Sequence, residues 1–203
     1  MIPLIIRHAI DNGMVGAGEK CLTPKDFAEK PVRFLNGDSR MPTVIDPNIY
    51  TWQFVSADSR SETLATFIVW GAHVEAGPGS NTQLTGEFAE HACNFVESKV
   101  GGTCLFQIGP QGGLPGPLGN PIPKIDSQGR YVDCDGNSIE GTETSDSPIP
   151  LLEGGRGIAL TPGAGPDRQG GTNLARMESL GRQIAKTGLA AVQDQSPQEV
   201  TDF

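Results

Sequence analysis

The histidines carry the side chains of this sequence that are best suited to catalysis or metal binding. There are three of them, His8, His73 and His91. His73 follows the apolar run Leu64–Trp70 and enters a loop rich in Gly, Pro and Asn, where an imidazole can act as a metal ligand or a general base. The pattern alone is equally consistent with a structural polar residue. We expect His8 to be an ordinary polar residue and His91 to face solvent from a helix.

The cysteines do not form a recognised metal-binding or redox motif. Cys21, Cys93, Cys104 and Cys134 are widely spaced, and no Cys-x-x-Cys pair is present. This spacing excludes zinc-ribbon and thioredoxin-type motifs. The cysteines are equally compatible with disulfides in an oxidising compartment and with free thiols packed as small apolar side chains. The sequence also lacks a GxSxG nucleophile motif, a Walker loop, an HExxH motif and a GxGxxG dinucleotide motif.

The segment Arg130–Ile139 is the part of the Gly- and Pro-rich region that most resembles ordered structure. Asp135 and Gly136 lie between two short runs, and this pair favours a type I′ hairpin turn. The segment also contains part of the pattern of an EF-hand calcium loop. Counted from Asp133, however, its Gly is fourth rather than sixth and Thr144 stands where the twelfth-position Glu is required, so calcium is not favoured.

A strand–helix–strand unit is predicted around His73. Ile49–Val55 is rich in β-branched and aromatic residues, and Leu64–Trp70 and Thr103–Ile108 are apolar runs typical of strands buried on both faces. The residues between the first two strands suit a tight hairpin. Glu87–Lys99 has the spacing of an amphipathic helix that buries one apolar face, with acidic residues in its first turn.

The order of these elements predicts where ligands bind. A strand, a helix and a second strand form a right-handed βαβ unit with parallel strands. The loops that begin at Gly71 and at Gly109 then leave the carboxyl ends of neighbouring strands and open on the same edge of the sheet, where α/β proteins bind ligands. A final helix, Asn173–Val192, is expected to pack back on this sheet.

Glycine and proline are concentrated in one region. Between Gly109 and Gly171 lie 15 of the 27 Gly and 9 of the 16 Pro residues. We therefore predict an α/β fold with a mixed sheet that contains the βαβ unit and a long irregular insert. The expected single domain comprises an irregular N-terminal segment (1–41), an α/β core (42–108), the insert (109–171) and a C-terminal helix (172–193).

Charge and hydropathy exclude several classes of partner. The net charge of −9 and the absence of a basic cluster argue against nucleic-acid binding, which requires a positively charged face. No apolar run reaches the roughly 18 residues of a transmembrane helix. The N-terminal ten residues carry their positive charge after the apolar stretch rather than before it, which is not the order of a signal peptide.

Several short motifs occur in an order that resembles the catalytic domain of the neutral/alkaline non-lysosomal ceramidase family. They cover about half of the chain, and the individual motifs are short. In chain order they are Val44–Pro47, Phe67–His73, Asn81, Leu84–Phe88, Leu105–Gly109, Pro110–Pro115 and Leu180–Ala185.

The resemblance implies a zinc-dependent amidohydrolase that cleaves the N-acyl bond of ceramide or of another amide-containing lipid. In such a site zinc polarises the amide carbonyl and lowers the pKa of the attacking group. His73 takes the place of one of the family's zinc-ligand histidines. The family is commonly secreted or membrane-associated outside the cytosol. The apolar loop Leu114–Leu118 suits either a lipid chain or packing within the protein.

The sequence departs from the family at several positions that bear on catalysis. The catalytic serine is replaced by Gly109, the aspartate of a Gly-Asp pair by Gly113, the aspartate of the helix start by Glu87, and the proline after the histidine by Val74. One histidine cannot hold zinc, because about three protein ligands are needed. We therefore expect either part of a longer catalytic domain or a diverged member. The alternative is a non-catalytic binding or structural domain on the same scaffold.

Overall fold

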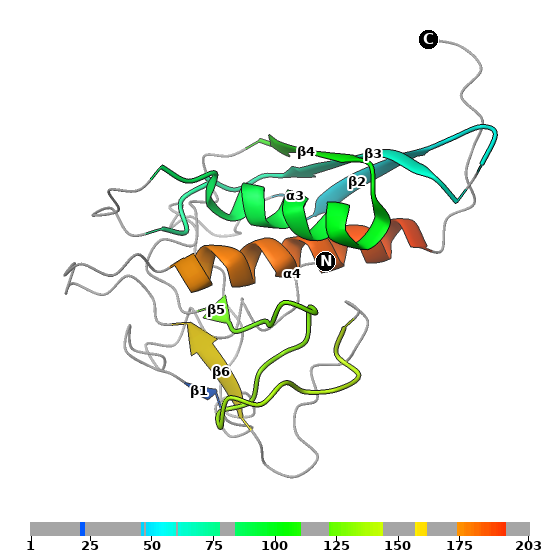
Figure 1. The fold of residues 1–203 in the computed structure, drawn as a ribbon. Coiled ribbons are helices and arrows are strands. Elements are labelled where there is room, and N and C mark those ends of the chain that lie inside the picture. The colour runs from blue at the N-terminus through cyan, green and yellow to red at the C-terminus, as the bar shows by residue number, and fades with distance from the viewer. Residues whose placement is uncertain are drawn as a thin grey trace.

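The described part of the chain is built in layers. The structure, a computed structural model, describes residues 21–22, 46, 48–59, 61–77, 84–110, 122–143, 157–161 and 174–193. Figure 1 shows a sheet of β2, β3 and β4 above the helices α3 and α4, and a smaller sheet of β1, β5 and β6 below them. The helices therefore lie between two sheets.

The predicted βαβ unit is confirmed. Its elements are β2 (Ile49–Val55), β3 (Thr63–Trp70), α3 (Glu87–Val100) and β4 (Thr103–Ile108). β2 and β3 form an antiparallel hairpin, as expected, and the Ser56 N–H donates to the Glu62 carbonyl across its loop (2.9 Å). β3 and β4 pair in parallel from Ala65–Thr103 to Trp70–Ile108. The mixed sheet and the α/β class follow directly from this topology.

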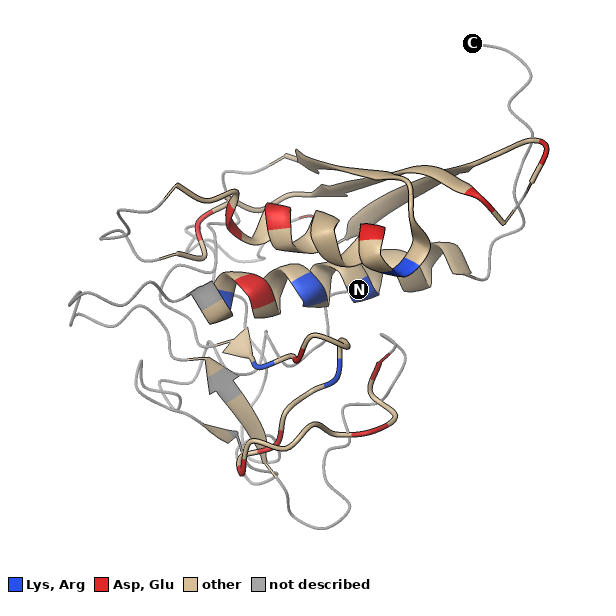
Figure 2. Ribbon diagram, viewed as in Figure 1, with Lys and Arg blue, Asp and Glu red and all other residues tan. Residues whose placement is uncertain are grey.

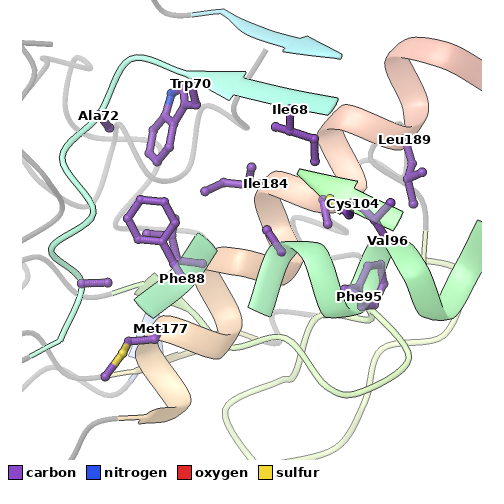
Figure 3. Packing of buried hydrophobic residues seen from close by; sticks show 14 of the residues in the cluster. Ile68, Trp70, Ala72, Phe88, Phe95, Val96, Cys104, Met177, Ile184 and Leu189 are labelled. Atoms are coloured by element: carbon purple, nitrogen blue, oxygen red, sulfur yellow. The ribbon is translucent and has the colours of Figure 1, made fainter. Parts of the chain in front are cut away.

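The main core lies between this sheet and the two helices (Figure 3). The apolar face predicted for α3 is confirmed, because Phe88, Ala92, Phe95 and Val96 are buried. The Phe88 ring meets Trp70 of β3 and Phe106 of β4 edge-on, with ring centroids 5.7 and 5.8 Å apart. Such edge-to-face contacts favour one fixed arrangement of helix and sheet.

The prediction that β3 and β4 are buried on both faces is wrong for the outer face of the sheet. Both helices lie on the same side. On the other side Leu105 of β4 is 56% exposed and Phe67 and Val69 of β3 are only partly buried. Three aromatic residues of β2 are also exposed there: Tyr50, Trp52 and Phe54 (43%, 49% and 48%). The three strands carry no Lys, Arg, Asp or Glu residue (Figure 2). An apolar run in the sequence indicates that both faces of a strand are apolar. It does not indicate whether one or two layers of structure cover the strand.

The smaller sheet involves the Gly- and Pro-rich region. β6 (Ile158–Thr161) pairs antiparallel with both β1 (Cys21–Leu22) and β5 (Ile122–Pro123). Ile125, Tyr131 and Ile158 form a second buried cluster. The described parts of the 109–171 range thus contain two short strands and several turns, and both strands pack on α4.

The predicted hairpin lies in this layer, but its turn is not type I′. The Gly136 N–H donates to the Asp133 carbonyl (3.0 Å), so Cys134 and Asp135 are the central residues. A type I′ turn needs a positive φ at both central residues, and among the described residues other than glycine only Glu87 has one. The Asp133 carboxylate accepts the N–H groups of Asp135 and Asn137 (3.0 and 2.8 Å), which stabilises the observed turn.

Helix α4 (Leu174–Gln193) packs on the sheet as predicted, and it also packs on the insert, which was not predicted. Its polar residues make the second contact. Ser179 accepts the Ile125 N–H (3.3 Å), Gln183 donates to the Tyr131 hydroxyl (3.1 Å), and the Lys186 ammonium donates to the Thr142 carbonyl (2.5 Å). The helix is therefore buried on both sides and lies at the centre of the described structure.

One disulfide joins Cys21 of β1 to Cys134 of the hairpin, whereas Cys93 and Cys104 are free thiols. The two alternatives left open by the cysteine spacing thus both occur in this chain. Among the described residues, no helix is long and apolar enough to cross a membrane.

Candidate functional site

The two loops that the sequence placed at one edge of the sheet are in contact. Trp70 and Ile108 are register partners at the ends of β3 and β4, and the Gly109 N–H donates to the Trp70 carbonyl (2.9 Å). A Cβ added at Gly71 would lie 2.4 Å from the Pro110 carbonyl oxygen. No real Cβ atom approaches an oxygen so closely, so the loops can meet in this way only because residue 71 is a glycine.

His73 lies in the first of these loops and is partly exposed to solvent. Its side chain is 39% exposed, and its Nδ1 lies 3.9 Å from Oε1 of Glu75. The Glu75 N–H donates to the His73 carbonyl (3.0 Å), which turns the loop so that both side chains lie near each other. The imidazole is thus accessible at the carboxyl edge of the sheet, with one carboxylate close to it.

The backbone after His73 is held by Glu87, the first residue of α3. Its two carboxylate oxygens accept the N–H groups of Ala76 (2.8 Å) and Gly77 (2.7 Å). Glu87 has a φ of 56°, which costs free energy for a residue with a side chain, and these hydrogen bonds offset that cost. Glu87 therefore positions the loop that carries His73.

Arg176 of α4 also holds the loop that carries His73, and this role was not predicted. Its buried guanidinium donates to the Ala76 carbonyl. Burial lowers the pKa of Arg176 to about 10, and the negative charge of Glu87 opposes this change. The sequence contained no signal for this contact, because Arg176 lies in a helix far from His73 along the chain.

Hydrogen bonds at the start of α3 also hold Glu87 in place. The Thr85 hydroxyl accepts the Glu87 N–H (3.0 Å), and Glu90 accepts the Gly86 N–H (2.9 Å). These contacts satisfy N–H groups that a helix start leaves without an intrahelical partner. They fix Glu87, which in turn fixes the His73 loop.

Gly109 has little space for a side chain. An added Cβ would lie 3.1 Å from Cγ1 of Val69 and 3.2 Å from the Gly71 nitrogen, so its neighbours would have to move by a few tenths of an ångström. Its φ is not in the left-handed region, and a serine is therefore compatible with the backbone here. As it stands, the position has no hydroxyl to act as a nucleophile.

The indole Nε1 of Trp70 is a further polar atom at the end of β3. It is buried and has no hydrogen-bond partner among the described residues. A buried donor without a partner is unusual in a folded protein and calls for a specific explanation, such as a bound water or ligand.

The described residues do not fit a complete zinc site. No group of three or more His, Cys, Asp and Glu side chains within the described ranges converges on one point. His73 and Glu75 provide two donors, whereas zinc needs about three protein ligands. Asp133, in the hairpin that resembles a calcium loop, accepts backbone N–H groups within its own turn.

Other residues singled out from the sequence do not join this site. His8, Asn81, Gly113 and the loop Leu114–Leu118 lie outside the described residues. His91 was expected to face solvent, but it is partly buried, because its Cβ lies at the crossing of α3 with Gly181 of α4. Among the three histidines, only His73 is described at the carboxyl edge of the sheet.

Comparison of the chain with protein-family models, with curated proteins and with solved structures finds no match.

Proposed function

We propose that this chain is a ceramidase-like amide hydrolase, or part of one, whose site lies where β3 and β4 end. The proposal depends mainly on one observation, the contact between the His73 loop and the Gly109 loop. The resemblance assigns a zinc ligand to the first loop and the nucleophile to the second. In a hydrolase these two groups must act on the same substrate bond, so their loops have to be adjacent.

In this proposal His73 is one zinc ligand, and residues outside the described ranges supply the others. The accessible imidazole and the nearby Glu75 carboxylate support this role, and Glu87 and Arg176 hold the loop in position. The substrate is ceramide or another amide-containing lipid, for which the support is the resemblance of the motifs.

The alternative is a non-catalytic binding or structural domain that keeps the α/β scaffold. Gly109 favours it, because this residue lacks a nucleophile and is closely packed. Under this alternative His73 makes only local contacts and binds no metal.

The disulfide between Cys21 and Cys134 supports a location outside the cytosol. Disulfides persist mainly in secreted proteins and in oxidising compartments. This agrees with the location that the resemblance implies.

Zinc binding by the full chain tests the role of His73. Equilibrium dialysis against zinc, followed by metal analysis, should show a site in the wild type whose affinity falls at least about tenfold in His73→Ala, because a ligand is lost. His91→Ala is the matched control and should bind zinc like the wild type, since His91 lies at the crossing of α3 with α4. Equal binding by wild type and His73→Ala would contradict the assignment, and no binding by the wild type would favour the alternative.

Replacement of Gly109 tests the nucleophile position. Gly109→Ser should hydrolyse a short-chain ceramide at least about tenfold faster than the wild type, because it restores a hydroxyl beside the His73 loop. Gly109→Ala is the control, since it adds the same Cβ without the oxygen. Equal rates for the Ser and Ala variants would show that the hydroxyl has no catalytic role.

A further inference from the structure

The free cysteines Cys93 and Cys104 form a pair in the core of the βαβ unit. Cys93 lies in the middle of α3, and Cys104 is the second residue of β4. Each thiol is the main influence on the pKa of the other, which indicates that the two thiols are neighbours. Both belong to the cluster between sheet and helices, in which Cys104 is 8% exposed and Cys93 is partly buried. Figure 3 shows Cys104 between β4 and the residues of α3.

A second contact keeps the two cysteines together. Glu97 lies one helical turn after Cys93, and its Oε1 accepts the Cys104 N–H (2.8 Å). This bond holds the start of β4 over the turn of α3 that carries Cys93. The pair is thus positioned by the backbone as well as by the thiols.

We propose that Cys93 and Cys104 are a redox-active dithiol that a small disulfide, such as glutathione disulfide, converts into a second disulfide of the chain. The proposal does not depend on the hydrolase function. It assigns Cys93 as the attacking thiol and Cys104 as the resolving thiol, because Cys93 is the more exposed of the two.

The exchange balances in two steps. The Cys93 thiolate attacks one sulfur of glutathione disulfide, a mixed disulfide forms, and one glutathione thiolate leaves. Cys104 then loses its proton to a glutathione thiolate and attacks the Cys93 sulfur, and the second glutathione leaves. Two protein thiols are oxidised by two electrons, and one glutathione disulfide is reduced to two glutathione molecules.

The electrostatics of the pair agree with this order of attack. Interaction with the Cys104 thiol lowers the pKa of Cys93, whereas interaction with the Cys93 thiol, together with burial, raises the pKa of Cys104. An attacking cysteine needs thiolate character, and a buried resolving cysteine does not react first. The negative charge of Glu97 opposes ionisation of both thiols.

The new bond would link the helix after the His73 loop to the strand before the Gly109 loop. The link spans the turn at Gly101 and Gly102. It would hold α3 on β4, because one cysteine of the pair lies in each of these elements. Thermal unfolding of the oxidised form should then occur several degrees higher than that of the reduced form, with Cys21–Cys134 intact in both.

Peptide mapping of the full chain after equilibration with glutathione disulfide tests the proposal. Alkylation and mass spectrometry should find Cys93 linked to Cys104, no bound glutathione, and Cys21–Cys134 unchanged. Bound glutathione without the internal link, or two free thiols, would overturn the proposal. This measurement uses the wild type, so it does not depend on a variant that folds.

Two variants test the assigned order of attack. Cys104→Ala should accumulate one glutathione on Cys93, because no resolving thiol is present. Cys93→Ala should leave Cys104 unmodified over the same time, because Cys104 is buried. Modification of Cys104 as fast as that of Cys93 would overturn the order, provided that circular dichroism shows both variants folded like the wild type.

Discussion

At the scale of single side chains, Lys186 is a charged residue that is held away from water. It is 4% exposed, donates to the Thr142 carbonyl, and lies 4.6 Å from the centre of the Tyr131 ring. Burial lowers its pKa from 10.5 to about 8, and the charges of Glu143 and Asp126 oppose this change. An ammonium group in this position makes folding dependent on pH.

The pH dependence of stability should differ between the wild type and Lys186→Met. Between about pH 8 and 10.5 the unfolded chain holds a proton on Lys186 that the folded chain has lost, so wild-type stability rises with pH in this window. Urea unfolding should show the stability of the wild type rising relative to the variant by up to about 3 kcal/mol.

The internal control is the range from pH 6 to about 7, below the folded-state pKa of about 8. Lys186 is charged in both states there, and the difference between the two proteins should stay constant. Parallel curves through pH 10 would show that burial does not perturb this lysine.

At the scale of helices and strands, the distance between α3 and α4 is set where the two helices cross. A Cβ added at Gly181 would lie 2.5 Å from the Phe88 carbonyl oxygen and 2.7 Å from the Ala92 nitrogen. Both are backbone atoms of α3, so they can move only if the helix moves. The close approach of the helices therefore depends on this glycine, as in other small-residue helix contacts.

Gly181→Ala should destabilise the fold by about 1–3 kcal/mol, because the helices must separate. Gly188→Ala, on the same helix, is the control. Its added Cβ meets Oγ1 of Thr51 at 2.9 Å, which is one side-chain atom rather than the backbone of a packed helix, and alanine favours the helix. Chemical denaturation should therefore show a much smaller loss for Gly188→Ala, and equal losses would contradict the close helix contact.

The whole described molecule has one sheet face covered by helices and one uncovered. Trp52 stacks on Tyr50 and Phe67 on the uncovered face, with ring centroids 6.4 and 5.7 Å apart. Ile68, the neighbour of Phe67 in β3, points to the opposite face and is fully buried. The two faces should therefore respond differently to truncation.

Ile68→Ala should cost about 2–5 kcal/mol of unfolding free energy, because it leaves a cavity in the core. Trp52→Ala should cost about 1 kcal/mol or less, since only its ring contacts are lost. Thermal or urea unfolding measures both. A larger loss for Trp52→Ala would show that the outer face of the sheet is covered in solution.

Much of the fold could be predicted from local patterns. The strands, α3 and the late helix have clear periodicities, and the order of the elements requires the parallel pairing of β3 and β4. The contact between the His73 and Gly109 loops follows from that pairing. Gly136 was correctly placed in a turn, but the turn type depends on the hydrogen bonds of the Asp133 side chain.

The supporting residues of the site could not be predicted. Arg176 is a charged residue in an amphipathic helix, and such residues usually face water. Here the insert covers Gln183 and Lys186, and the His73 loop lies against Arg176, so all three are buried. Helix periodicity separates apolar from polar faces, but it does not reveal that a second layer will cover the polar one.

The sequence by itself determined the βαβ unit and the edge at which its loops open, because these depend on local periodicity and on the handedness of the chain. Only the tertiary structure decided which cysteines pair, which face of the sheet is covered, and how Glu87 and Arg176 hold the His73 loop. Those contacts join residues that are distant along the chain. Packing of the layers brings them together, and no local pattern encodes it.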